Sequence, residues 1–164
     1  MKNILITGGA GFIGSNLAIA LIDKGYTITV LDSLSEQIHG QEAEYTSPLF
    51  NSIKGEVTFI NGRVTSRHGW GSAIANQDAI IHLAAETGTG QSMYEIERYI
   101  DVNIGGTAIM LDLLANSKHK VAKVIVASSR AIYGEGKYQC ADHGIVYPLQ
   151  RTESDMVGGD FECK

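Results

Sequence analysis

A glycine-rich decapeptide near the amino terminus constrains this chain more than any other stretch. It reads Thr7-Gly8-Gly9-Ala10-Gly11-Phe12-Ile13-Gly14-Ser15-Asn16. An apolar run at 3–7 precedes it and predicts a short buried strand, and the apolar spacing across 12–24 predicts a helix. A strand, a glycine turn and a helix in this order form the context in which a glycine motif predicts nucleotide binding. The same kind of turn also joins a strand to a helix without any ligand.

Each glycine of the motif has its own expected part. Gly8 permits a tight turn, Gly11 lets a pyrophosphate approach the backbone, and Gly14 lets the helix pack closely on the strand. The backbone N–H groups at the helix start, those of Phe12 and Ile13 among them, would face the phosphates, where the helix dipole favours negative charge.

A carboxylate follows at the distance that a ribose site requires. Asp32 ends the second predicted strand, 26–32, roughly 20 residues beyond the glycines, where it can accept hydrogen bonds from a ribose diol. Its charge would also repel a 2′-phosphate, so Asp32 favours NAD over NADP. The alternative is that Asp32 merely begins a turn with Ser33.

The composition is that of a globular protein. The chain has 164 residues, 44% hydrophobic and 19% charged, which is enough for one domain with a sizeable core. With a net charge of -5 and scattered Lys and Arg, we expect neither a nucleic-acid partner nor a basic membrane face. We also expect no membrane span, because no apolar run approaches 18 residues. The two cysteines and the absence of a signal-like N-terminus predict a cytoplasmic location.

Alternating elements predict an α/β fold, a Rossmann-type doubly wound parallel sheet with strand order 3-2-1-4-5. Ligand would lie across the carboxyl ends of strands one and four. The predicted strands are 3–7, 26–32, 57–60, 79–85 and 121–127, and the predicted helices are 12–24, a short one around 41–45, 70–76 and 92–117. The domain would occupy 1–133, and 134–164 would be a loop-rich tail that leads to a missing C-terminal part.

The longest predicted helix contains two adjacent glycines. Gly105 and Gly106 lie inside 92–117. Each costs about 1 kcal/mol relative to alanine in a helix interior. The pair therefore predicts close backbone packing, a kink or a break.

Five stretches carry a family resemblance: Thr7–Gly14, Asp32, 82–85, 103–107 and 128–134. Together they resemble the extended short-chain dehydrogenase/reductase family, specifically its NAD-dependent nucleotide-sugar epimerases and dehydratases. The runs at 84–92 and 129–134 are most similar to the 4-epimerases that act on dTDP-deoxyhexoses. One departure is Arg63, since the family usually has an aspartate there at the adenine edge; an arginine could stack on the ring instead.

The resemblance implies site residues for NAD and for a nucleotide-activated sugar. Ser129 would be the catalytic serine and would hydrogen-bond the reacting sugar hydroxyl, and Thr87 would contact the substrate. The alternatives are that Ser128 and Ser129 cap a strand and that Thr87 is an ordinary loop residue. His82 is interpreted as a core histidine. The expected cofactor-binding residues are Gly8, Gly11, Phe12, Ile13, Gly14, Asp32, Val64, Leu83, Ala84, Ala85, Ala127 and Ser128.

The resemblance also implies a part that this chain lacks. The family transfers hydride from a sugar carbon to NAD and back, with a tyrosine base and a lysine four residues later on one helical face. Tyr133 and Lys137 have that spacing, but Gly134 and Gly136 oppose a helix, so we reject the pair. We therefore expect an N-terminal portion of an epimerase that is inactive alone, with a homodimer contact through 92–117. The alternatives are a dehydratase or reductase, a non-catalytic NAD-sensing module, and a regulatory protein without cofactor.

Three residues near the end are weak metal candidates. Cys140 and His143 have Cys-x-x-His spacing, and Cys163 follows. Three ligands without a fourth do not predict a metal here, and an ordinary insertion loop is the alternative.

Overall fold

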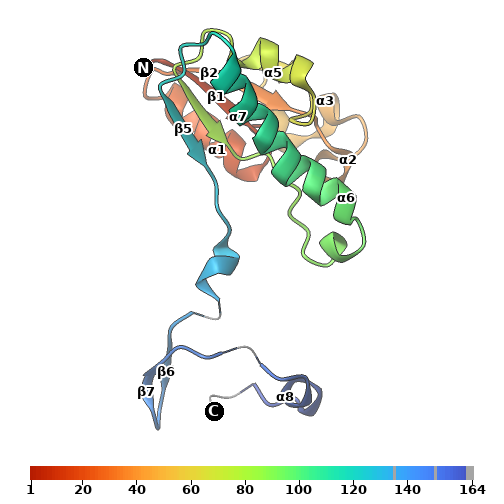
Figure 1. Cartoon of the computed structure of the whole chain (residues 1–164), viewed down its shortest axis with the longest axis vertical. Helices are drawn as coiled ribbons and strands as arrows, with labels where there is room; N and C mark the ends of the chain where they lie inside the picture. Colours follow the sequence, from red (N-terminus) through yellow and green to blue (C-terminus); the bar gives the residue numbers. More distant parts are fainter. Residues whose placement is uncertain (135, 150, 162–164) are drawn as a thin grey trace. The chain divides into compact units, whose positions relative to one another are not determined.

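The computed structural model describes residues 1–134, 136–149 and 151–161. Contacts divide the chain into two compact units, Met1–Ala127 and Ser128–Lys164 (Figure 1). Sequence reasoning placed the corresponding boundary after residue 133. The first unit contains the sheet, and each unit is described on its own.

The first unit is built on a five-stranded parallel sheet with the order β3-β2-β1-β4-β5. The predicted fold class and strand order are therefore confirmed. The register pairs Thr7 with Leu31 on one side and with His82 on the other, so the carboxyl ends of the three central strands lie together. The strands are β1 (Asn3–Thr7), β2 (Thr27–Asp32), β3 (Thr58–Asn61), β4 (Ala79–His82) and β5 (Lys123–Val126).

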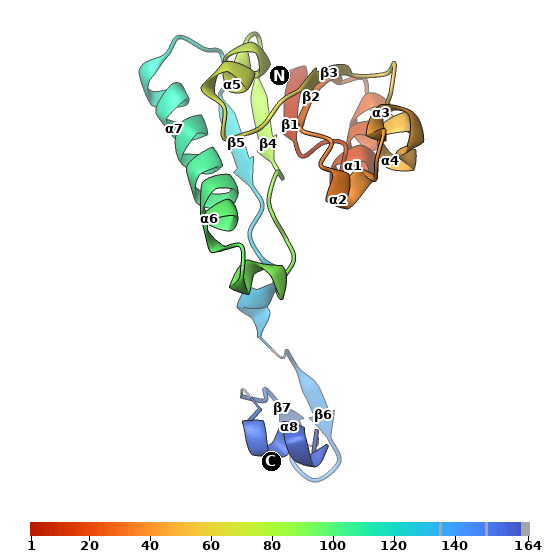
Figure 2. The same ribbon diagram turned by 90° about the vertical axis from the view of Figure 1, so that its right-hand side faces the viewer.

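Successive residues of one strand enter two different cores, because side chains alternate across a sheet. Ile4 and Ile6 of β1 belong to the core on one face, whereas Leu5 belongs to the core on the other. Figure 2 shows α1 (Phe12–Ile22) on one side of the sheet, and α5 (Arg67–Ile74) and α7 (Gly106–Asn116) on the other. Apolar strands covered on both faces are typical of parallel sheets.

The segment after β2 differs from the expected loop with one short helix. It forms three short helices, α2 (Glu36–His39), α3 (Ala43–Thr46) and α4 (Pro48–Asn51). Ser47 caps α4, since its hydroxyl accepts a hydrogen bond from the backbone N–H of Phe50. Phe50 and Ile53 are buried in the core beside α1. Helices of four residues are too short to show an apolar period, which is why the sequence pattern missed them.

The long helix begins later than predicted and is irregular. A 3₁₀ turn, η1 (Gln91–Met93), precedes α6 (Ile96–Tyr99), and a π-helical turn, η2 (Ile100–Gly105), joins α6 to α7. A Cβ atom on Gly106 would lie 2.7 Å from Val64 Cγ2, so Gly106 is closely packed, against a side chain, whereas a Cβ atom on Gly105 would make only an ordinary contact at 3.8 Å. No helix in the described part of the chain combines the length and apolarity needed to cross a bilayer.

The second unit contains more regular structure than the expected loop-rich tail. It has a 3₁₀ turn, η3 (Arg130–Tyr133), an antiparallel hairpin of β6 (Tyr138–Cys140) and β7 (Gly144–Val146), and α8 (Glu153–Gly158). The Thr152 hydroxyl caps α8 by accepting from the backbone N–H of Asp155. Strands of three residues are too short to show an alternation of apolar and polar side chains, so the sequence pattern did not predict them.

Candidate functional site

The glycine turn is packed so tightly that three of its positions, 8, 9 and 14, exclude a side chain; a Cβ atom on Gly9 would lie 2.7 Å from both methyl carbons of Val30. Gly8 has φ +66, and a Cβ atom there would lie 2.8 Å from the backbone nitrogen of Ala84. A Cβ atom on Gly14 would lie 2.3 Å from the carbonyl oxygen of Gly8. The N–H of Gly8 also donates to Leu31 O at 2.9 Å. The turn is thus held against β2, against the loop after β4 and against α1.

The start of α1 is open to an anion. Gly11 is the N-cap residue, no side chain caps the helix, and its first turn contains no acidic residue. The N–H groups of the first turn, those of Phe12, Ile13 and Gly14, have no acceptor within the helix. The side chains of Phe12 and Ile13 are 74% and 66% exposed. Bare amides at a positive helix end attract phosphate oxygens.

Asp32 lies across the turn from the helix start. One carboxylate oxygen accepts from Ala10 N at 3.0 Å, and the other accepts from Leu34 N at 2.9 Å. Each carboxylate oxygen has two lone pairs, so these two bonds leave acceptor capacity for a ligand hydroxyl. Asp32 therefore ties the glycine turn to β2 and presents a fixed negative charge beside it.

Sequence reasoning missed His39, which lies next to Asp32. Its Nδ1 is 2.8 Å from the hydroxyl of Ser47, and its Nε2 is 3.9 Å from Oδ1 of Asp32. The His39 side chain is 2% exposed. The position of the His39 ring depends on how the segment 33–56, which contains α2, α3 and α4, folds. The Ser47-Pro48 pair was the available signal, since serine followed by proline is typical of a helix start.

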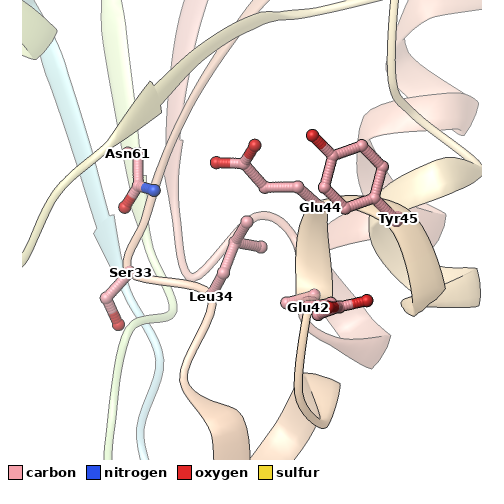
Figure 3. Close-up of a pocket in the computed structure, with 7 residues that line it drawn as sticks. Ser33, Leu34, Glu42, Glu44, Tyr45 and Asn61 are labelled. Carbon is pink, nitrogen blue, oxygen red and sulfur yellow. The ribbon is translucent and has the colours of Figure 1, made fainter.

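A hollow of about 350 Å³ adjoins the ends of β2 and β3. Figure 3 shows Ser33, Leu34 and Asn61 from the strand ends and three side chains from the α3 region around it, Glu42, Glu44 and Tyr45. Two carboxylates therefore line a cavity that begins one residue beyond Asp32. Such a cavity disfavours an additional anion.

The residues after β4 lie at the same carboxyl edge of the sheet as the glycine turn, on the side of β1 that is opposite β2. Leu83 N donates to Thr7 O at 3.1 Å, and Ala84 N donates to the Thr7 hydroxyl at 3.2 Å. Leu83 and Ala84 are half-buried, and Ala85 is exposed. Ala127 N in turn bonds to His82 O at 3.1 Å. Leu83 and Ala84 thus lie between β1 and β4, where the strand order reverses and where doubly wound sheets bind ligands, and Ala127 lies one strand further along, at the end of β5.

His82 is a core histidine, as predicted. It is 3% exposed, and Nδ1 and Nε2 lie 2.7 Å and 3.1 Å from the hydroxyls of Thr7 and Thr107. Thr7 accepts from Ala84 N and Thr107 donates to Asn103 O, so a neutral ring protonated on Nε2 satisfies the whole chain of bonds. Burial lowers the pKa of His82 below its ordinary value.

Val64 and Thr87, which were both expected to contact a ligand, differ from each other in burial. The Val64 side chain is 6% exposed and packs in the core near Trp70, so only its main chain could contact a cofactor. Thr87 is exposed on a loop that α6 and η2 hold in place. Asn103 exchanges two hydrogen bonds with the backbone of Glu86, and the Tyr99 hydroxyl donates to Gly88 O.

The remaining predicted residues belong to the second unit. The Ser129 hydroxyl accepts from Ala131 N at 3.1 Å and so caps the 3₁₀ turn η3, whereas the alternative left open by the sequence was a cap at a strand end. Tyr133 ends η3, and Gly134 follows with φ +61, so Tyr133 and Lys137 do not share a helical face. Ser128 is exposed.

The metal candidates also lie in the second unit. Cys140 Sγ lies 3.4 Å from His143 Nδ1. Cys163 lies outside the described residues.

Comparison with known proteins gives a consistent result. A model of the NAD dependent epimerase/dehydratase family matches residues 4–152. A dTDP-L-rhamnose 4-epimerase of Burkholderia thailandensis is 39% identical over 163 residues, which cover 98% of this chain and 44% of the relative. A UDP-glucose 4-epimerase of Neisseria meningitidis serogroup A is 31% identical over 138 residues, 82% of this chain and 39% of the relative.

Comparison with solved structures also finds a UDP-glucose 4-epimerase. The crystal structure of UDP-glucose 4-epimerase from Bifidobacterium longum in complex with NAD+ and UDP superposes with a TM-score of 0.64 and 31% identity, over 81% of this chain and 38% of that one. The chain spans less than half the length of these relatives. Since the family match covers nearly the whole chain, the glycine turn, Asp32 and the sheet order have one explanation: the chain belongs to the NAD-dependent epimerase/dehydratase family.

Proposed function

We propose that this chain is the NAD-binding part of a nucleotide-sugar 4-epimerase. The observation that carries the proposal is the pairing of an uncapped helix start at Gly11 with a carboxylate, Asp32, on the far side of the glycine turn. A dinucleotide needs both, because its pyrophosphate seeks amide donors and its ribose diol seeks an acceptor.

The residues of this edge fit the cofactor. Positions 8, 9 and 14 exclude a Cβ atom, whereas a Cβ atom on Gly11 would meet only Gly8 O, at 3.3 Å. Packing therefore constrains Gly11 less than Gly8, Gly9 or Gly14, as expected where a ligand approaches the backbone. The amides of Phe12 and Ile13 would hold the pyrophosphate, Asp32 the adenosine ribose, and Leu83 to Ala85 the nicotinamide side.

The charges around Asp32 support NAD rather than NADP. Asp32 is a fixed anion, and Glu42 and Glu44 line the adjoining hollow. A third phosphate placed there would face three carboxylates at short range, with no cation among the residues that line the hollow. Like charges at close range disfavour binding.

His39 is a positioning residue for Asp32 in this proposal. If the Ser47 hydroxyl donates to Nδ1, the proton of the neutral ring is on Nε2, the nitrogen nearest Oδ1 of Asp32. A buried ring on that side limits the rotation of the carboxylate. Asp32 would then meet the ribose in one orientation.

The chemistry that this part serves is a reversible oxidation of the sugar. When bound, NAD accepts a hydride from a sugar carbon and returns it to the opposite face. Ser129 would orient the sugar hydroxyl, since a serine that accepts one hydrogen bond keeps a donor proton and a second lone pair. Thr87 would contact the sugar. The base and its lysine partner lie outside this chain, so the chain alone would not turn over sugar.

The length of the similarity supports a dTDP-deoxyhexose as substrate. The dTDP-L-rhamnose 4-epimerase matches 98% of the chain, whereas the UDP-glucose 4-epimerase of Neisseria meningitidis matches 82%. The first match therefore extends through the second unit, which follows the sheet. A dehydratase or reductase on the same scaffold is the alternative; a keto sugar as product would identify the dehydratase, and a keto sugar as substrate the reductase.

An exposed apolar stripe supports a homodimer. Ile96, Ile100 and Ile104 repeat every four residues along α6 and η2, and they are 59%, 50% and 65% exposed. Residues at this spacing share one helix face. A second copy of the same face would cover the stripe.

Calorimetric titration of the chain with NAD and with NADP tests the proposal. We expect NAD to bind at least about tenfold more tightly than NADP, since one unfavourable charge contact of about 1.4 kcal/mol has that effect. The Asp32→Ala variant should lose this preference along with most of its NAD affinity. Equal affinity for the two cofactors, or no heat with either from a folded sample, would overturn the assignment.

A further inference from the structure

Two segments that leave the sheet on either side of β1 meet through their side chains. The helix α2 follows β2, and the turn η1 and the helix α6 follow β4, while β2 and β4 both pair with β1. Figure 2 shows α2 on the side of the sheet that carries α1, and α6 on the side that carries α7. A contact between these segments therefore crosses the carboxyl edge of the sheet, where the glycine turn lies.

The contact is a reciprocal pair of side-chain amides. Gln37 Nε2 donates to Gln91 Oε1 at 2.7 Å, and Gln91 Nε2 donates to Gln37 Oε1 at 3.2 Å. Arg98 Nη2 adds a bond to Gln37 Oε1 at 3.3 Å. No other hydrogen bond or ion pair among the described residues joins α2 to η1 or α6. We call Gln37, Gln91 and Arg98 the clasp.

The half of the clasp that follows β4 is held in place by further bonds. Gln91 Nε2 also donates to Glu95 Oε1 at 2.8 Å. The Arg98 guanidinium pairs with Glu86 at 3.0 Å and with Glu95 at 2.8 Å. Gln37, by contrast, is an exposed residue in a helix of four residues. The Gln37 half is therefore the one that can open, because an exposed amide loses little when it exchanges a protein partner for water.

We propose that the clasp closes over a bound dinucleotide and controls how fast the dinucleotide enters and leaves. This role rests on the proposed function, in which Asp32 holds the adenosine ribose and Leu83 to Ala85 line the nicotinamide side. Gln37 lies five residues beyond Asp32, and Gln91 lies six residues beyond Ala85. The same two segments thus supply the contacts for both ends of the dinucleotide and the bonds of the clasp.

A dinucleotide that spans these contacts would run between the sheet edge and the clasp, so the clasp would have to open for it to pass. In the proposed reaction NAD ends each cycle in its starting form, so slow release does not limit turnover. The clasp residues bond to one another rather than to the ligand. Their loss should therefore speed both entry and release and leave the affinity nearly unchanged.

Stopped-flow fluorescence with NADH tests the clasp. In Gln37→Ala, the rate constants for NADH association and dissociation should both rise by at least about threefold, with a much smaller change in Kd. Gln41→Ala is the matched control and should keep both rate constants of the wild type, since Gln41 is an exposed glutamine of the same segment whose side chain has no hydrogen bond among the described residues.

The outcomes separate the clasp from the proposed function. Unchanged rate constants in Gln37→Ala, or a change confined to one of them, would overturn the clasp while NADH binding by the wild type still supports the cofactor site. A folded wild type that binds no NADH would overturn both.

Locking the clasp gives an independent readout. A chain with Gln37→Cys and Gln91→Cys, in a background of Cys140→Ser and Cys163→Ser, can be joined by a short bis-maleimide linker. Linked after NADH has bound, the protein should retain NADH through gel filtration; linked beforehand, it should take up NADH much more slowly than the unlinked protein. Circular dichroism checks that both samples are folded. Free exchange of NADH in the linked protein would overturn the proposal.

Discussion

Replacing single glycines of the turn by alanine should separate packing from ligand binding. At position 14, the new Cβ atom would lie 2.3 Å from Gly8 O and 2.5 Å from Gly9 Cα, and both contacts are with backbone. It must move about 1 Å to reach an ordinary contact, and overpacking of this kind costs about 1–3 kcal/mol or more. The gain in helix propensity offsets only about 1 kcal/mol of this.

At position 11 the same substitution makes one tight contact, which a shift of a few tenths of an ångström relieves. The only neighbour is Gly8 O at 3.3 Å, and φ is -72, which alanine readily adopts. We therefore expect Gly11→Ala to fold with a melting temperature close to the wild type. Its methyl group would occupy the space through which a pyrophosphate reaches the amides. Loss of one charge-assisted hydrogen bond, about 1.5–3 kcal/mol, corresponds to at least a tenfold rise in the Kd for NAD.

Differential scanning fluorimetry and calorimetric titration, applied to three variants, check this reasoning. Gly14→Ala should melt about 5–10 °C below the wild type, from a loss near 2 kcal/mol. Gly71→Ala is the control, since Gly71 lies in α5 with nothing within 4 Å of its Cβ position, and it should melt slightly higher and bind NAD normally. A Gly14→Ala protein as stable as the wild type, or a Gly11→Ala protein with unchanged Kd, would refute the assigned roles.

Four further outcomes are expected. Asp32→Ala should raise the Kd for NAD by at least tenfold, because a hydrogen bond to a charged group contributes about 1.5–3 kcal/mol. Asp112→Ala is the control in the same titration and should leave the Kd unchanged, since Asp112 is an exposed carboxylate paired with Arg67. His39→Gln should weaken NAD binding less than Asp32→Ala does, and an equal or larger loss would show that His39 does more than orient the carboxylate. Because burial lowers the pKa of His82 in the folded state, its contribution to stability is complete above the unfolded pKa of about 6.5 and is lost as pH falls through the folded pKa; urea unfolding of His82→Gln should lack this part of the acid dependence. Ile100→Glu should shift sedimentation from dimer to monomer without lowering NAD affinity, and an unchanged sedimentation coefficient would argue against the α6–η2 interface.

Local backbone rules were enough to anticipate the sheet and its tightly packed glycine turn. Gly8 and Gly14 lie where any Cβ atom would clash, so the spacing of these glycines indicates how closely the strand and the helix pack. The strands β1, β2 and β4 are apolar on both faces, so both faces must be buried by other elements. This is typical of a parallel sheet with helices on both sides. These inferences succeed because each depends on residues close together in the chain.

Contacts between distant segments could not be anticipated in the same way. The approach of His39 to Asp32 and the burial of Val64 against Gly106 depend on how short helices and turns fold back. Segments of three or four residues carry no readable period, so their side chains acquire partners only once larger elements have packed. The glycine turn could thus be predicted from the order of the residues, whereas the buried surroundings of Asp32, His39 among them, are decided only by tertiary packing.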